Sequence, residues 1–398
     1  MSKQLLGNLS NADVQSEQFE SRATELVHRF AVTVTSEVPA HWPKAATPVE
    51  VRGHIVQMRE FLAVWSDTYA RHLGAAPRFV EVRDAVGAPL LQVPLAITAK
   101  RGALVLTFAD HGAADYNAPL LHPALRDLQR AEVQQLWRAI EAALPKVDIV
   151  DLEKMPGSIG NRPNPLFCLA NMPNAESCHG SDLTRPLDEI EATQAQLKTL
   201  RRKLRSLEKL GVVQFTVAST QAERKALLTA ALDQKQRRFE ETQVPGFAET
   251  PQTRDFFEQA TSAFAQTDNL RFCALSVDGE IVATSWNVAL GTRLYELMIG
   301  FAGGEWSKHS SGRILNLMLL KWAKENGYHY LDHGIGDEAW KAENCDTHVP
   351  LGRMLAARTP RGRRALAVRK LIGRLRETAL YHRLRPWKWI VRRALQRS

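Results

Sequence analysis

The chain has 398 residues, of which 44% are hydrophobic and 24% charged, so it holds enough apolar material for two or three globular domains. It contains four cysteines, none in a Cys-x-x-Cys pair, which excludes a disulfide scaffold and argues against a structural zinc motif. No apolar run is long enough to predict a membrane-spanning helix, and the N-terminal segment lacks the pattern of a signal peptide. We therefore expect a cytoplasmic protein.

The net charge of +9 comes from the C-terminal segment, 358–398, which holds 14 Lys and Arg residues and one acid. The remaining residues comprise 38 bases and 42 acids. In 358–398, apolar residues recur at helical spacing, and Trp387 and Trp389 lie among arginines. This pattern favours peripheral binding to an anionic membrane surface, at the inner face of the membrane. RNA binding, which is less favoured, and packing against the protein body are the alternatives.

The two halves of the chain repeat one order of predicted elements: a helix, three strands, a loop, a helix and a strand. In the first half these cover 53–72, 79–83, 88–98, 103–109, 125–144 and 147–152. In the second half they cover 223–242, 272–277, 280–290, 293–300, 312–325 and 328–333, with hairpin turns at Asp278-Gly279 and Gly291-Thr292. The order predicts two similar α/β domains with mixed, mainly antiparallel sheets flanked by helices. We expect them at 1–184 and 185–357, before a basic helical tail at 358–398.

A further helix is predicted at 185–210, between the two repeats. Its leucines at 197, 200, 204 and 207 form one stripe, and its basic residues lie mostly off that stripe. The basic face is either solvated or binds an anionic substrate or partner. Residues 154–182 are rich in Pro, Asn, Gly and Ser, which is typical of a loop.

The start of the helix at 312–325 has the residue types of an anion site. A helix start presents unpaired backbone N–H groups and the positive end of the helix dipole, both of which attract phosphate. Small and basic residues gather there: Lys308, His309, Ser310, Ser311, Gly312 and Arg313. The equivalent junction in the first half, 121–124, contains a proline and neither Gly nor Ser. We therefore expect a phosphate-bearing cofactor in the second half; the alternative is a capped helix without a ligand.

Several motifs resemble the acetyltransferase domain of the CelD-like proteins of cellulose biosynthesis, which belong to the GNAT superfamily and share a tandem fold with the FemAB transferases. The resemblance is clearest over about 195–355 and rests on Leu275–Gly279, Ile281–Ala283, Tyr295, Ser310–Gly312, Leu331–Lys341 and the preceding Arg201–Gly211. The first half matches mainly in element order and in Asp115-Tyr116-Asn117. The family usually has Ser-Pro-Gly and Tyr-Lys where this chain has Ser310-Ser311-Gly312 and Trp340-Lys341, so the chain lacks a hydroxyl that could donate a proton.

The resemblance implies direct transfer of an acyl group from acyl-CoA, acetyl-CoA or longer, to an amine or hydroxyl of a cell-envelope or exopolysaccharide-related acceptor. In that fold two parallel strands splay and the pantetheine lies between them. By resemblance, Ser310, Ser311, Gly312 and Arg313 hold the pyrophosphate. Ile299 and Gly300 offer backbone groups to the pantetheine and the thioester.

Attack of an amine or hydroxyl on a thioester needs positioning, a proton acceptor and polarisation of the carbonyl. Asp332, at the end of the last strand, is the predicted base or substrate clamp; capping of the following turn is the alternative. Lys341 is expected to hold an anionic substrate or the oxyanion, unless it is a surface lysine. Glu296 lies on a central strand, where a buried acid is costly without a role or a partner.

We expect the acceptor to contact His333 and the first-half residues Asp115, Tyr116 and Asn117, although turn chemistry could also explain those three. His333 and Asp332 face opposite sides of their strand, so we expect no metal site there. Two other functions stay open. One is a FemAB-type transfer from aminoacyl-tRNA, with RNA bound by the basic helix and tail. The other is a non-catalytic, membrane-associated scaffold.

Overall fold

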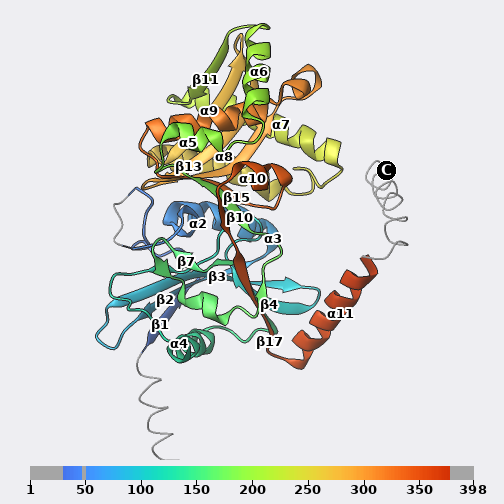
Figure 1. The fold of residues 1–398 in the computed structure, drawn as a ribbon. Coiled ribbons are helices and arrows are strands. Elements are labelled where there is room, and N and C mark those ends of the chain that lie inside the picture. Colours follow the sequence, from blue (N-terminus) through green and yellow to red (C-terminus); the bar gives the residue numbers. More distant parts are fainter. Residues whose placement is uncertain (1–29, 47–50, 377–398) are drawn as a thin grey trace, which may run out of the picture.

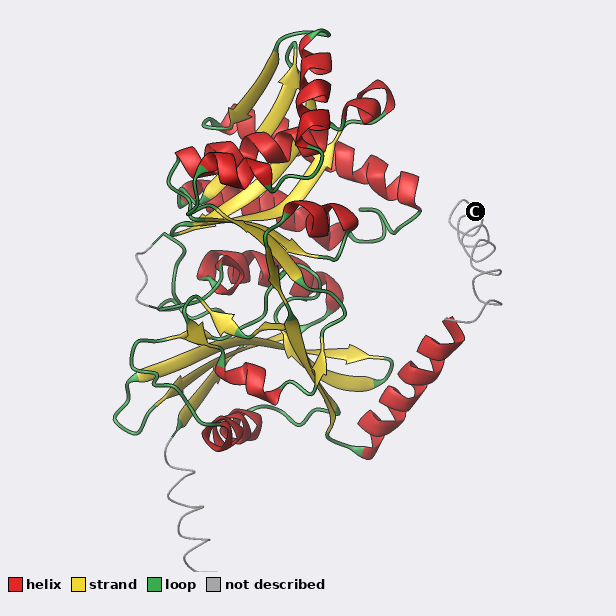
Figure 2. Ribbon diagram, in the orientation of Figure 1, coloured by secondary structure: helices red, strands yellow, loops and turns green. Residues whose placement is uncertain are grey.

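The protein is described by a computed structural model that covers residues 30–46 and 51–376. Two halves lie one above the other, each with a sheet flanked by helices (Figure 1; Figure 2). The predicted fold class, mixed α/β in two similar units, is confirmed. In the described part of the chain no helix is long and apolar enough to cross a membrane.

The first sheet is antiparallel except where β4 pairs with β6. Its strands lie in the order β1 (Ala31–Thr35), β2 (Ala76–Arg83), β3 (Pro89–Lys100), β4 (Ala103–Phe108), β6 (Ile149–Pro156), β17 (Leu351–Ala357) and β9 (Met172–Pro173), with β5 (Leu120–Leu121) beside β3. A separate small ladder joins β7 (Ser158–Ile159) and β8 (Arg162–Pro163).

The second sheet repeats this plan, with one parallel pair, β14 and β15. Its order is β11 (Val213–Val217), β12 (Leu270–Val277), β13 (Glu280–Leu290), β14 (Arg293–Phe301), β15 (Tyr330–Ile335), β10 (Cys178–Asp182) and β16 (Thr347–Val349). The predicted turn at Asp278-Gly279 joins β12 to β13, and both residues have positive φ, 46° and 85°, as a tight hairpin requires.

The helices follow the predicted order with four additions. The first half holds η1 (Ile55–Gln57), α2 (Arg59–Trp65), η2 (Ser66–Ala70), α3 (Arg71–Leu73), α4 (Arg130–Ala143) and η3 (Pro165–Leu169). The second half holds α5 (Leu187–Ala192), α6 (Leu197–Glu208), α7 (Gln221–Thr242), α8 (Pro251–Gln266), η4 (Gly304–His309), α9 (Ser311–Glu325) and α10 (Ala339–Asn344), and α11 (Pro360–Arg376) follows β17. The additions are η3, η4, α10 and the long α8.

The two halves exchange strands. β10 precedes residue 184 in the chain but pairs with β15 and β16 of the second sheet. β17 follows the second sheet in the chain but pairs with β6 and β9 of the first, and it runs down between the halves in Figure 1. Because these pairings join residues far apart in sequence, local patterns do not show them. The sheets therefore divide the chain differently from the expected ranges 1–184 and 185–357.

One hydrophobic core cluster spans both halves. The helices α2 and α8 pack together, and the rings of Phe61 and Phe256 meet edge to face with centroids 5.0 Å apart. Trp65 from the first half and Trp286 from the second belong to the same buried cluster. A core shared in this way fixes one half against the other, so a site at their junction is preformed.

Candidate active site

The parallel strands β14 and β15 separate at the centre of the second sheet. Their pairing covers Arg293–Tyr295 and Tyr330–Asp332 and, within the described residues, goes no further. Beyond this point β14 keeps its antiparallel partner β13, as in the pairs Ser285–Ile299 and Thr284–Gly300. The edge of β14 that faces β15 is therefore left without a ladder at 296–301, where Ile299 and Gly300 lie.

The start of α9 lies at the end of the separated part of β14. Gly312 brings the helix close to the strand, because a Cβ there would lie 3.1 Å from the ring of Phe301. Ser310 has a left-handed backbone, φ 57°, and its Oγ accepts a hydrogen bond from Lys203 Nζ of α6 at 2.5 Å. The first amides of α9 are thus accompanied by a lysine, as an anion site requires.

Ser311 and Arg313 have side chains that are already bonded within the protein. Ser311 is buried, and its Oγ donates to the backbone oxygen of Val282 at 3.1 Å. Arg313 donates to the backbone oxygen of Ala195 at 3.1 Å and to Asn344 Oδ1 at 2.8 Å. Arg313 therefore links α9 to α10, and its charge lies beside the start of α9.

Glu296 and His333 face each other where β14 and β15 separate. His333 Nδ1 and Glu296 Oε2 are 2.7 Å apart, and Ser285 Oγ donates to Glu296 Oε1 at 2.8 Å. Burial would raise the pKa of Glu296, but the contacts with His333 and Ser285 and the charge of Lys341 outweigh it and hold that pKa below its usual range. This buried carboxylate therefore stays ionised.

Lys341 is buried rather than on the surface. Its Nζ donates to the backbone oxygen of Ile335 at 2.6 Å, and Glu338 Oε2 lies 3.3 Å away. The ammonium thus lies at the carboxyl end of β15, next to the separated strands.

Asp332 lies at the junction of the two halves, on the opposite face of β15 from His333. Its Oδ2 accepts from Arg293, with Nη2 at 2.5 Å, and its Oδ1 accepts from the Tyr116 hydroxyl at 3.2 Å and from the Gly334 amide at 2.9 Å. The contact with Gly334 is the predicted turn cap. Both oxygens are occupied, so the carboxylate joins the first half to the second.

Asp115 lies against the carboxyl end of β15. A Cβ on Gly334 would come within 2.3 Å of Asp115 Oδ2, so only a glycine leaves room for this carboxylate. Burial, then the negative charge of Asp332, raises the pKa of Asp115 to about 7, while Lys154 and Lys341 oppose the shift. Such a carboxyl group can exchange a proton near neutral pH.

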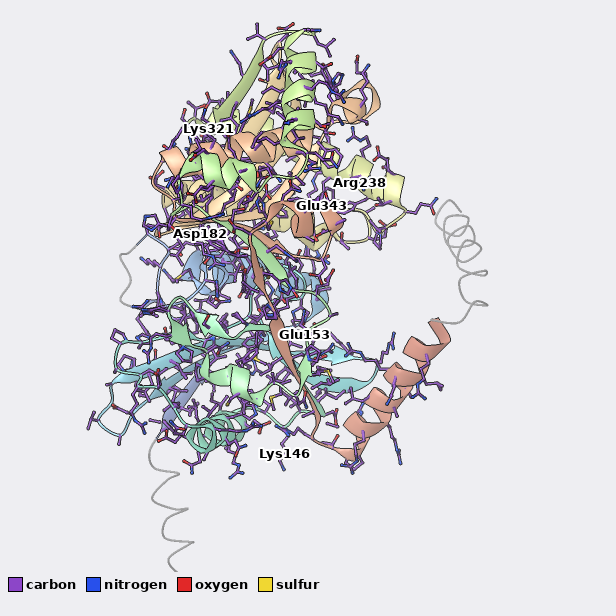
Figure 3. The ribbon with its side chains drawn as sticks, in the orientation of Figure 1. Lys146, Glu153, Asp182, Arg238, Lys321 and Glu343 are labelled. Atoms are coloured by element: carbon purple, nitrogen blue, oxygen red, sulfur yellow. The ribbon has the colours of Figure 1, made fainter. Side chains whose placement is uncertain are left out.

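A cleft of about 1010 Å³ opens in the first half, where β4 and β6 separate beyond two paired positions. Asp110, Asn117 and Lys154 line it, and Lys154 Nζ lies 2.8 Å from Asp110 Oδ2. Asn117 donates to the same Asp110 oxygen at 3.0 Å. Glu153, another lining residue, lies beside β17 in Figure 3. The lining thus combines acidic, amide and basic side chains with apolar ones, among them Phe108, Ile149 and Leu366.

The predicted residues therefore fall into three groups. The separated strands and the start of α9 hold Glu296, Ile299, Gly300, Ser310, Ser311, Gly312, Arg313, His333 and Lys341. The junction of the halves holds Asp115, Tyr116 and Asp332, and the first-half cleft holds Asn117. Asp115 and Lys154 connect the last two groups, because Lys154 influences the pKa of Asp115 and lines the cleft.

Sequence reasoning missed the first-half partners of this site. His54 stacks on Tyr116 with ring centroids 4.4 Å apart, and its Nδ1 lies 3.3 Å from the Tyr295 hydroxyl. Burial lowers the pKa of His54 well below its usual value, so the ring is neutral. Lys154 stands in a segment whose composition predicts a loop. Neither residue belongs to a motif, so only the fold reveals them.

Residues 194–342 match the family model described as "Acetyltransferase (GNAT) domain". A search of curated proteins gave no match. Among solved structures, the chain is similar to FemX, with 10% identity over 77% of this chain and 93% of that one and a TM-score of 0.50. A tandem GNAT protein from the clavulanic acid biosynthesis pathway is 12% identical over 83% of this chain and 99% of that one, with a TM-score of 0.43. L-PGS from Bacillus licheniformis is 14% identical over 83% and 98%, with a TM-score of 0.42.

The likeness to FemX concerns the fold of both halves, and the CelD-like resemblance stays a prediction. The family match covers the strands that separate, the start of α9 and the residues up to Lys341. Residues 194–342 thus match an acetyltransferase domain of the GNAT type, and this match supports the predicted acyltransferase at the level of that domain.

Proposed function

We propose that this protein transfers an acyl group from acyl-CoA, held in the second half, to an amine or hydroxyl of an acceptor bound in the first-half cleft. One observation carries the proposal: β14 and β15 separate beside the start of α9, where Lys203 is hydrogen-bonded to Ser310. All of these residues lie within the range that matches the acetyltransferase domain. For the acceptor we propose a polar cell-envelope or exopolysaccharide-related molecule, in keeping with the CelD-like resemblance and with the charged and amide side chains of the cleft.

In this proposal the amides of Ser311 and Gly312 and the Lys203 ammonium hold the pyrophosphate, and Arg313 adds charge beside it. Backbone groups near Ile299 and Gly300 bind the pantetheine along the free edge of β14. The acceptor nitrogen or oxygen attacks the thioester carbonyl carbon and forms a tetrahedral intermediate. The C–S bond then breaks, and CoA leaves as a thiolate that the Lys341 charge stabilises.

We assign the proton acceptor to Asp115 rather than to Asp332. Asp115 lies at the end of β15 beside the cleft, whereas both oxygens of Asp332 are engaged by Arg293, Tyr116 and Gly334. Asp332 then acts as a positioning residue for the junction. Glu296, held by His333 and Ser285, keeps β14 and β15 in place at the point where they separate.

The decisive experiment is calorimetric titration of acetyl-CoA and a long-chain acyl-CoA into the full chain. Ser310→Asp should abolish binding, because it places an acid at the phosphate site. The variant should fold, because the left-handed backbone at position 310 tolerates Asp. The new carboxylate would pair with Lys203 and so withdraw that ammonium from the phosphates. Ser311 is less suitable, since it is buried. The matched control, Gln221→Asp, adds an acid to the exposed start of α7 and should bind like the wild type.

Absence of heat with either acyl-CoA in a folded sample would contradict the proposal. It would favour a FemAB-type transfer from aminoacyl-tRNA, which one observation supports: α6 presents exposed Arg201, Arg202 and Arg205 beside the start of α9. RNA retention by the wild type, lost on charge reversal in α6, would establish that alternative. If neither acyl-CoA nor RNA binds, the non-catalytic scaffold is the remaining alternative.

We also propose that 358–398 binds an anionic membrane surface. Within its described part, α11 exposes Val368 and Leu371 among arginines, which suits a lipid interface. Trp387 and Trp389 lie outside the described residues. Flotation with vesicles that contain an anionic lipid should retain the protein, and high salt or neutral vesicles should release it.

A further inference from the structure

Three side chains with metal-ligand chemistry converge at the far edge of the second sheet. His179 of β10 is the register partner of His348 of β16, and their ring centroids are 5.2 Å apart. Asp337, in the loop between β15 and α10, brings its Oδ1 to 2.9 Å from His179 Nε2. One nitrogen or oxygen from each residue lies within 4.8 Å of the other two. Three separate segments thus supply two imidazoles and a carboxylate to one point.

The exposure of the three residues leaves this point accessible from solvent. His179 is buried, whereas Asp337 and His348 are exposed. Among the described residues no hydrogen bond holds the His348 ring. Asp337 also faces the amide of Ser177 at 3.4 Å, so its loop is already anchored to the chain before β10. Because two of the three side chains are accessible, an ion can enter without unfolding of the protein.

We propose that His179, Asp337 and His348 bind one divalent transition-metal ion, of which Zn²⁺ is the best match. Two imidazoles and one carboxylate are a ligand set that zinc accepts, with a fourth position for water. Zinc–ligand bonds of about 2.1 Å place tetrahedral ligand atoms about 3.4 Å apart. The 2.9 Å pair of His179 and Asp337 is close to that spacing, and the exposed His348 ring can turn to complete it.

The ion would fasten the loop after β15 to β10 and to the edge strand β16. That loop begins at Gly336, whose amide donates to Ser177 at 3.0 Å, and leads into α10, which carries Lys341. The proposed role is therefore structural: binding stabilises the folded chain by mass action. It does not depend on acyl-CoA, and it concerns residues other than His333 and Asp332, for which the sequence predicts no metal.

The site escapes sequence reasoning because its ligands are far apart. His179 and Asp337 are separated by 158 positions and belong to no ligand motif. Only the placement of β10 in the second sheet brings them together.

The test is titration of Zn²⁺ into tag-free full-length protein after treatment with a chelator, by calorimetry, with Co²⁺ absorption as a second readout. We expect one equivalent with a Kd of about 10 μM or tighter and a higher melting temperature with Zn²⁺. His348→Ala and Asp337→Asn should weaken binding at least about tenfold, since each removes one ligand. Both residues are exposed, so both variants should fold.

The matched control is His329→Ala, which removes an exposed histidine just before β15. It should bind Zn²⁺ like the wild type and show the same thermal shift. Wild-type binding weaker than about 100 μM, or equal binding by His348→Ala, would overturn the proposal. Because the readout is the metal alone, this result is independent of whether acyl-CoA binds.

Discussion

Arg293 and Asp332 are a charge pair in which burial is uneven. The Asp332 carboxylate is fully buried, whereas the Arg293 side chain keeps 26% of its surface exposed. The guanidinium also lies over three aromatic rings, of Tyr116, Tyr295 and Tyr330, the last with its centroid 4.3 Å away. Removing the carboxylate would leave this cation among rings without its counter-charge.

We therefore expect Asp332→Asn to lower the free energy of unfolding by about 3 kcal/mol, the lower end for a broken buried pair because Arg293 is partly exposed. Urea denaturation of the full chain measures this. Glu258→Gln breaks the exposed pair with Arg254 on α8 and should cost less than about 0.5 kcal/mol. Equal losses in the two variants would mean that the junction does not depend on Asp332.

Asp115 gives the activity a predicted pH dependence. Its pKa of about 7 means that the base is protonated and inactive in acid, so kcat/KM should rise with pH through about 7. Asp332 faces it as a like charge, and Lys154 and Lys341 face it as opposite charges. Asp115→Asn should lower kcat/KM about 100-fold or more and remove this rise. An unchanged profile in the variant would assign the titration to another group.

The raised pKa of Asp115 should also make the stability of the protein depend on pH. Stability should fall with rising pH, whereas kcat/KM should rise. The folded protein holds the Asp115 proton up to about pH 7, whereas the unfolded chain loses it near pH 4. The free energy of unfolding should therefore fall as pH rises from about 4 to 7, to the extent that Asp115 contributes. Asp115→Asn should flatten this decline in pH-dependent urea curves.

At this scale the sequence could identify the charged residues but not their partners. Asp332 stands out at a predicted strand end, Glu296 as an acid within a predicted central strand, and Lys341 as a lysine in the motif that follows the last strand. Whether each is a base, a clamp or a structural pair depends on His333, Arg293 and the Ile335 carbonyl, which reach them through the fold. Burial and hydrogen bonding decide a carboxylate's role, and neither follows from residue type.

Among the elements, α6 and α9 together make up the proposed phosphate site. α6 has a leucine stripe, with Leu200 and Leu207 buried, so its lysines and arginines face away from the core. Lys203 alone of these is bonded to the start of α9, through Ser310. Of the two predicted alternatives for the basic face, we therefore propose anion binding for Lys203 and solvation for the other basic residues of α6.

Lys203→Glu should weaken CoA binding at least about tenfold, because it replaces a charge-assisted contact by repulsion. Calorimetry with CoA and the full chain measures the change. Lys209→Glu makes the same charge reversal at the exposed end of α6 and should leave the affinity within about twofold of wild type. Equal effects of the two variants would show that the whole basic face acts through its long-range field.

The helices and hairpins could be predicted from the sequence, because their signals are local. The helix α7 begins at a Thr220–Glu223 capping box, and the β12–β13 turn is Asp-Gly. The two-residue strands β7, β8 and β9 fall in 154–182, where composition predicts a loop, since two residues show no alternation. The strands that pair with β10 and β17 could not be predicted, because no local sequence pattern shows which strand is a partner.

For the whole molecule, the exchanged strands and the shared core make the two halves one unit. Loss of β10 would strip β15 and β16 of their common partner, and loss of β17 would leave an edge of β6 unpaired. The domain ranges expected from the repeat therefore do not predict autonomous folding units.

We expect the full chain to unfold in one transition that coincides by circular dichroism and tryptophan fluorescence. A fragment of residues 185–357 lacks β10 and should be insoluble or unfold without cooperativity. The control fragment, 177–357, restores that strand and should be the more soluble of the two. Cooperative unfolding of 185–357 with the stability of the full chain would contradict this expectation.

The position of β17 also sets an order of events during synthesis. A ribosome completes β1 to β6 early, yet the strand that covers β6 emerges only after the entire second half. The nascent first half therefore keeps an open sheet edge while the second half is synthesised, a state prone to mispairing and to capture by chaperones. The first sheet can therefore close only after the ribosome has synthesised the residues that match the acetyltransferase domain.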